Sequence, residues 1–136
     1  MDKIHVPARL ESLEVVSAFV RGAMQYAGMD PKRQTEISIA VEEVFVNILS
    51  YAYPSGTGEV TIMLPVGPDG LRIIFMDTGI PFNPLTHADP DLSLPADERD
   101  VGGLGIYLIK KMTDNIEYRY EKGANILTLE YLALRR

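Results

Sequence analysis

Three short motifs in this 136-residue sequence carry residue types that could do chemistry. Glu43 and Asn47 stand four positions apart in a run with helical hydrophobic spacing, so their side chains point within about 40° of each other. A carboxylate and an amide so placed can hold a hydrated divalent cation together with a water or a hydroxyl group. Taken alone, the same pair is also compatible with a solvated Glu beside a surface Asn.

The second motif ends a predicted strand, where Asp77 is followed by Thr78 and Gly79. A carboxylate at a strand end can accept a hydrogen bond from the exocyclic amine of adenine, whereas guanine presents a carbonyl at that position. A turn Asp before Gly explains these residues equally well in isolation.

The third motif is rich in glycine, with Gly102, Gly103 and Gly105 at the start of a short apolar run. Glycines at a helix start let backbone N–H groups approach an anion such as phosphate. The spacing is neither that of a Rossmann fingerprint nor that of a P-loop. These glycines alone would also fit a loop and a helix start that bind no ligand.

Composition limits the classes of protein that these motifs can belong to. The net charge of −6 and the lack of any basic run argue against nucleic-acid binding. The absence of cysteine excludes disulfides and cysteine nucleophiles, and two histidines are too few for a histidine metal cluster. With no apolar run of about 18 residues and no signal-peptide core, we expect a cytoplasmic protein. The length predicts one domain over residues 1–136.

The elements that must position the motifs follow from hydrophobic periodicity. Apolar residues recur every three or four positions over Leu10–Ala27 and from Pro31 to about Ala52, which predicts two helices. Alternation predicts strands around residues 4–6, 60–64, 71–75, 116–120 and 127–131, with a short helix at 105–112. The expected fold is an α/β two-layer sandwich, with a mixed, mostly antiparallel sheet covered on one face by helices.

Residues 78–102 fit neither period and hold four of the nine prolines. Loops of this length without structure are uncommon in compact domains unless they serve as lids or binding loops. The acidic residues in this segment are most simply explained as a solvated face. The segment is therefore predicted to be a lid or a binding loop.

The three motifs, in this order, resemble the GHKL (histidine-kinase-like) ATPase superfamily, and within it the stand-alone anti-sigma-factor serine/threonine kinases of bacterial partner switching. The resemblance covers nearly the whole chain and lies in Glu43–Asn47, Asp77–Pro84 and Gly102–Ile109. The sequence departs from the family at Tyr51, where His is frequent, and at Asn83, where Asp is common.

The resemblance implies an ATP site between helices and sheet, with residues 85–102 as the ATP lid. By matching positions, Glu43 would be the general base for the attacking serine hydroxyl. The implied nucleotide contacts are Asn47 through Mg²⁺, Asp77 on the adenine amine, Gly79 at the base, Gly103 and Gly105 at the phosphates, and Thr128 on the adenine side.

The function implied is an ATP-binding serine/threonine protein kinase that phosphorylates an anti-anti-sigma-type partner and, in another state, sequesters a sigma factor. Homodimerisation is left open by the sequence. The alternative is a non-catalytic regulatory module, in which ATP only orders the lid and shapes a surface for a partner. The presence of Glu43 favours the kinase.

Overall fold

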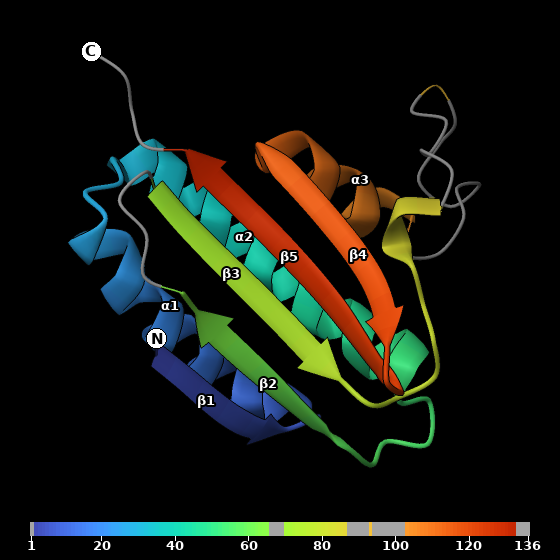
Figure 1. Cartoon of the computed structure of the whole chain (residues 1–136). Helices are drawn as coiled ribbons and strands as arrows, with labels where there is room; N and C mark the ends of the chain where they lie inside the picture. The colour runs from blue at the N-terminus through green and yellow to red at the C-terminus, as the bar shows by residue number, and fades with distance from the viewer. Residues whose placement is uncertain (1, 66–69, 87–92, 94–102, 133–136) are drawn as a thin grey trace.

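The computed structural model describes residues 2–65, 70–86, 93 and 103–132. Five strands form one sheet in the order β1-β2-β3-β5-β4 (Figure 1). All four neighbouring pairs are antiparallel, so the described strands contain none of the parallel pairing of the expected mixed sheet. The strands are β1 (Asp2–Pro7), β2 (Glu59–Leu64), β3 (Gly70–Asp77), β4 (Asn115–Glu121) and β5 (Ala124–Leu132).

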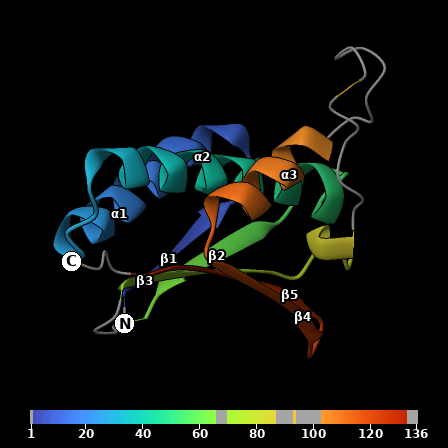
Figure 2. The ribbon, with the colours of Figure 1, turned by 90° about the horizontal axis from the view of Figure 1, so that it is seen from above.

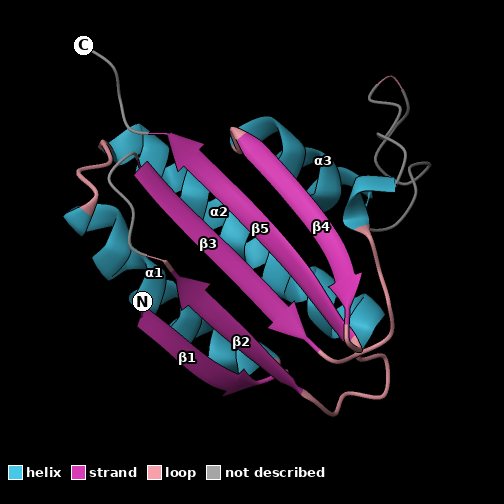
Figure 3. Cartoon of the chain, in the orientation of Figure 1, coloured by secondary structure: helices cyan, strands magenta, loops and turns pink. Residues whose placement is uncertain are grey.

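The helices lie on one face of the sheet, which confirms the two-layer α/β sandwich (Figures 2 and 3). The three α-helices are α1 (Leu13–Tyr26), α2 (Pro31–Asn47) and α3 (Gly103–Met112). Short 3₁₀ turns stand at η1 (Leu10–Ser12) and η3 (Pro84–Thr86). No helix in the described parts of the chain is both long enough and apolar enough to cross a membrane.

Helix α2 begins where the sequence predicts and changes character near its end. The Asp30 side chain accepts a hydrogen bond of 2.8 Å from the Arg33 amide, and Pro31 occupies the first turn, where its missing N–H is not needed. The predicted single helix to Ala52 is an α-helix to Asn47 followed by the π-helical turn η2 (Ile48–Ala52). Such turns occur often at functional sites.

The core fills the space between the sheet and the helices. Side chains that alternate along the strands meet the apolar stripe of α2 there, as their two periods require. The largest fully buried side chains include Phe45, Phe75 and Tyr131, from α2, β3 and β5.

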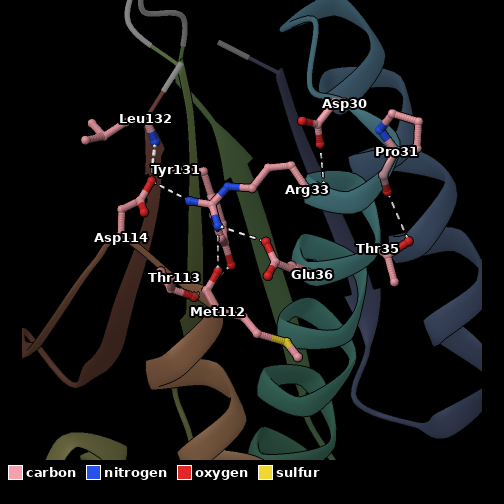
Figure 4. A network of polar contacts seen from close by, with 10 residues as sticks. All are labelled: Asp30, Pro31, Arg33, Thr35, Glu36, Met112, Thr113, Asp114, Tyr131 and Leu132. Carbon is pink, nitrogen blue, oxygen red and sulfur yellow. Dashed lines mark hydrogen bonds and ion pairs between the residues drawn. The ribbon is translucent and has the colours of Figure 1, made fainter. Parts of the chain in front are cut away.

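A polar network ties the start of α2 to the end of α3 and to β5 (Figure 4). Arg33 forms an ion pair with Asp114 and donates hydrogen bonds of 3.2 Å to Glu36 and to the carbonyl oxygen of Met112. Its guanidinium carbon lies 5.0 Å from the centre of the Tyr131 ring, a cation–π distance. The network therefore fixes one end of α2 on the sheet.

Candidate functional site

A cleft lies between the sheet and the other end of α2, and residues of the first two motifs line it. Its volume is about 390 Å³, part of it open to solvent. Asn47 and Asp77 face it, although each residue is less than a tenth exposed. Most of the remaining lining is apolar and comes from α2, η2, β3, α3 and β5, which suits a flat organic ring with a few polar groups to orient it.

Asp77 ends β3 directly opposite Asn125 of β5. Its Oδ1 atom accepts hydrogen bonds of 2.8 Å from the Asn125 amide and 2.9 Å from the Gly79 N–H. Burial raises the pKa of the Asp77 carboxyl, against the lowering effect of these two hydrogen bonds. Both bonds use the same oxygen, so Oδ2 keeps its capacity to accept from a bound group.

Asn125 is a site residue that the sequence reasoning missed. Its amide nitrogen also donates to the Ile80 carbonyl at 3.0 Å, and its Oδ1 accepts from the Phe82 amide at 3.0 Å and from the Tyr118 hydroxyl. A signal was present, because Asn125 stands at an inward position of β5, in phase with the buried Leu127.

The prediction that Thr128 lines the adenine side is wrong for this cleft. Successive side chains of a strand point to opposite faces of the sheet. Leu127 and Leu129 are buried toward the helices, so Thr128 between them lies on the uncovered face, and it is not among the lining residues. The position on β5 that faces the cleft beside Asp77 is Asn125.

Gly79 lies where the strand end meets η2. A Cβ atom at this position would come within 2.3 Å of the Ala52 carbonyl oxygen, which also accepts a hydrogen bond of 2.8 Å from the Ile80 amide. Any side chain would therefore push the end of η2 away from the loop after β3. This packing alone requires glycine, and the expected close approach of a base at Gly79 stays a prediction.

Glu43 and the start of α3 contact each other, although neither Glu43 nor Gly105 is among the residues that line the cleft. A Cβ atom at Gly105 would lie 2.3 Å from the Glu43 Oε2 atom, so the carboxylate rests against this glycine. Gly103, the other predicted phosphate-binding glycine, is the first residue of α3. Glu42 is exposed, whereas Glu43 is half-buried. The first and third motifs are thus adjacent, as an ATP site requires.

The two departures from the family pattern have local explanations. The Tyr51 ring stacks on Phe82, with centroids 4.4 Å apart and planes 15° from parallel, which joins η2 to the loop after β3. Asn83 accepts a hydrogen bond of 2.9 Å from the Leu85 amide through its Oδ1. An aspartate could accept the same bond, so Asn83 preserves this turn.

Asn47 brings one side-chain amide into the cleft, where its nitrogen and its oxygen could contact a bound nucleotide in different ways. Its buried Nδ2 atom has no hydrogen-bond partner in the part of the chain that the structure describes, and it could donate to a phosphate oxygen. A cation would instead be held by the amide oxygen, Oδ1. Over the same residues, no cluster of three or more acidic, histidine or cysteine side chains could hold a metal. Mg²⁺ commonly takes one or two protein ligands and completes its shell with phosphate oxygens and water, so the residues present fit that arrangement.

Most residues of the predicted lid lie outside the described part of the chain. Of residues 85–102, only Leu85, Thr86 and Ser93 are described, so the lid prediction lies outside the described residues, as does Gly102. Leu85 and Thr86 belong to η3, where the Thr86 amide and hydroxyl both donate to the Asn83 carbonyl.

Known proteins match this chain over nearly its whole length. The serine-protein kinase RsbW of Bacillus mycoides is 28% identical over 134 residues, which cover 96% of this chain and 84% of that protein. RsbW of Bacillus cereus strain AH187 shows the same identity and coverage.

A crystal structure of RsbU and RsbW domains from Mycobacterium tuberculosis has the same fold, with a TM-score of 0.64 and 15% identity. The similarity covers 100% of this chain and 34% of that longer one. The family model for the histidine kinase-like ATPase domain matches residues 6–131. This chain belongs to the histidine kinase-like ATPase domain family.

Proposed function

We propose that this chain is an ATP-dependent serine/threonine protein kinase that phosphorylates an anti-anti-sigma-type partner and, in another state, sequesters a sigma factor. Relatives named serine-protein kinases support the activity. The observation that carries the proposal is the contact between the Glu43 carboxylate and Gly105 at the start of α3. This contact supports the proposal because it would bring a proton acceptor close to phosphates bound at that helix start. Action in the cytoplasm is part of the same proposal.

The base of the nucleotide would enter the cleft beside Asp77. The Asp77 carboxylate accepts a hydrogen bond from the adenine amine through the oxygen that the protein leaves unused. A guanine carbonyl at the same position would meet a second acceptor, so the site discriminates against GTP.

The phosphates would extend toward the start of α3. Backbone N–H groups at a helix start and the positive end of the helix dipole favour negative charge there. Mg²⁺, bound with the nucleotide and held by Asn47, would neutralise phosphate charge.

Glu43 would act on the attacking hydroxyl of the partner. As the serine oxygen bonds to the γ-phosphorus and ADP leaves, the hydroxyl proton passes to the Glu43 carboxylate. The half-buried position of Glu43 on a rigid helix keeps the carboxylate in place for this transfer.

The test is label transfer from γ-labelled ATP with Mg²⁺ to candidate partners or to lysate proteins from the same source. The kinase predicts acid-stable label on a serine or threonine of a small partner. If ATP binds but no protein acquires label, the non-catalytic interaction module replaces the kinase. A size measurement with and without ATP would decide whether the chain forms homodimers.

A further inference from the structure

Asn125 is the point at which β3, β4, β5 and the loop after β3 are joined by side-chain hydrogen bonds. Its amide nitrogen donates to Asp77 Oδ1 at 2.8 Å and to the Ile80 carbonyl at 3.0 Å. Its amide oxygen accepts from the Phe82 N–H at 3.0 Å and from the Tyr118 hydroxyl. An asparagine side chain can make about four such bonds, so this amide is fully used within the protein.

This complete use has a consequence for Asp77. The orientation of the Asn125 amide is fixed from both sides, since its oxygen must face two donors and its nitrogen two acceptors. The Asn125 amide nitrogen therefore donates to one oxygen of the Asp77 carboxylate, Oδ1. The carboxylate is held in one rotamer, and Oδ2 is the oxygen left for a ligand in the cleft.

Asn125 also sets where the loop after β3 can lie. Ile80 and Phe82 are bonded to the two ends of the same amide, and Phe82 lines the cleft. The apolar wall and the carboxylate that would receive the base are thus positioned by a single side chain.

We propose that Asn125 is a positioning residue that orients the Asp77 carboxylate and the Phe82 wall together, and so sets the preference of this cleft for an adenine nucleotide over a guanine nucleotide. This inference rests on the proposed function. Asn125 acts through Asp77 and Phe82 and has no amide capacity left for the base itself.

The electrostatics around Asp77 allow a sharp test. Asn125 is neutral, and Tyr118 of β4 is the titratable group that faces Asp77 across it. Burial raises the pKa of Tyr118, the Phe82 backbone lowers it and the charge of Asp77 raises it further, so the tyrosine is neutral at physiological pH. A carboxylate in place of the Asn125 amide would therefore be the only new charge beside Asp77.

The main experiment measures ADP and GDP affinities of the wild type and of Asn125→Asp at a series of pH values. The aspartate keeps the shape and the acceptor for Phe82 and Tyr118 but faces Asp77 with a second carboxylate. Two adjacent carboxylates share a proton, so ADP affinity should be about tenfold to a hundredfold below wild type near pH 8 and should recover as the pH falls toward about 5.5. The wild type has no second carboxylate beside Asp77, so its ADP affinity should not rise in this way as the pH falls.

Two further variants separate positioning from folding. Asn125→Thr keeps one hydroxyl donor for Asp77 and suits a strand, so it should retain more ADP affinity than Asn125→Ala. Asn115→Ala is the matched control, because it removes an amide from β4 whose side chain bonds Glu130 on the surface, away from the cleft. It should leave ADP affinity, the ADP-to-GDP ratio and the pH profile at wild-type values.

The outcomes distinguish this inference from the proposed function. If the wild type binds ADP but Asn125→Asp and Asn125→Ala keep its affinity, nucleotide preference and pH profile, the positioning role is overturned and the kinase is untouched. A wild type that binds neither nucleotide overturns both. Loss of ADP affinity in Asn125→Asp that is the same at every pH, without recovery in acid, also contradicts the inference.

Discussion

The two ends of α2 differ in whether their polar side chains have hydrogen-bond partners within the protein. At its start, the Arg33 guanidinium is paired with Asp114, Glu36 and the Met112 carbonyl and is covered by an aromatic ring (Figure 4). At its end, Asn47 is buried with an amide nitrogen that has no partner among the described residues. The polar groups at the start of the helix are therefore bonded within the protein, whereas at its end a buried N–H donor is left that a ligand could satisfy. This division is typical of a protein that spends stability at its functional site.

Two aspartates make the same contrast in electrostatic terms. Burial alone would raise the pKa of Asp114, but the Leu132 amide and Arg33 outweigh it and lower the pKa. At the cleft, burial prevails and raises the pKa of Asp77. The ionised carboxylate therefore stabilises the fold at the start of α2 and opposes folding at the cleft.

The largest effect is expected for the proton acceptor. Glu43→Gln keeps the size of the side chain but cannot take a proton, so single-turnover phosphoryl transfer should fall by roughly 10² to 10⁴ while ATP binding stays near wild type. Glu42→Gln is the control, because Glu42 lies about 100° around the helix and is exposed. If transfer instead fails in Glu42→Gln and survives in Glu43→Gln, the assignment of the first motif is wrong by one residue.

The next effect concerns the opposite end of the helix. Arg33→Met keeps the apolar stem but leaves Asp114 and the Met112 carbonyl without their donor, so the free energy of unfolding should fall by roughly 2 to 3 kcal/mol. ADP affinity of the folded protein should not change. Urea denaturation and calorimetry would check the two quantities separately, and a weaker ADP affinity in the folded variant would break the contrast between the two ends.

Asp77→Asn should have the opposite effect to Arg33→Met, lowering ADP affinity without lowering stability. Loss of a hydrogen bond to a charged group is worth about 1.5 to 3 kcal/mol, so ADP affinity should drop roughly tenfold to a hundredfold. The free energy of unfolding of the ligand-free protein should not fall. Thr128→Val is the comparison on β5, and it should bind ADP as the wild type does, because Thr128 lies on the uncovered face of the sheet.

The smallest effect is a pH dependence of opposite sign for the two aspartates. Stability from Asp114 is present above its ordinary pKa of 3.8 and is lost as the pH falls through its lowered pKa. Stability from Asp77 is present below 3.8 and is lost as the pH rises through its raised pKa. At neutral pH, Asp114→Asn should therefore lower the free energy of unfolding, and Asp77→Asn should raise it or leave it unchanged. Urea denaturation between about pH 3 and pH 7 would check this. If the contrast were wrong, both variants would change the free energy of unfolding in the same direction.

Local signals in the sequence were sufficient for most of the fold. The start of α2 at Pro31, the apolar stripe of that helix and the alternation in β5 each depend on neighbours a few residues apart, and the structure confirms them. The strand order β1-β2-β3-β5-β4 and the π turn after Asn47 depend on packing between distant segments, which local periodicity does not contain.

The residues of the candidate site also differ in whether local sequence signals could identify them. Asp77 and Glu43 stand in recognisable motifs, so their positions could be predicted. Asn125 bonds to Asp77 across 48 residues of sequence, and its role depends on the register between β3 and β5. Thr128 was misplaced because matching by strand alone ignores which face of the sheet a residue occupies.

The most direct test of the account is a backbone-amide NMR titration of the wild-type chain with Mg-ADP. The account predicts that signals of Asn47, Asp77, Asn125 and Gly105 shift together with one dissociation constant, while those of Arg33 and Asp114 stay in place. Shifts confined to the Arg33 end, or saturable binding with no change at the cleft, would contradict it.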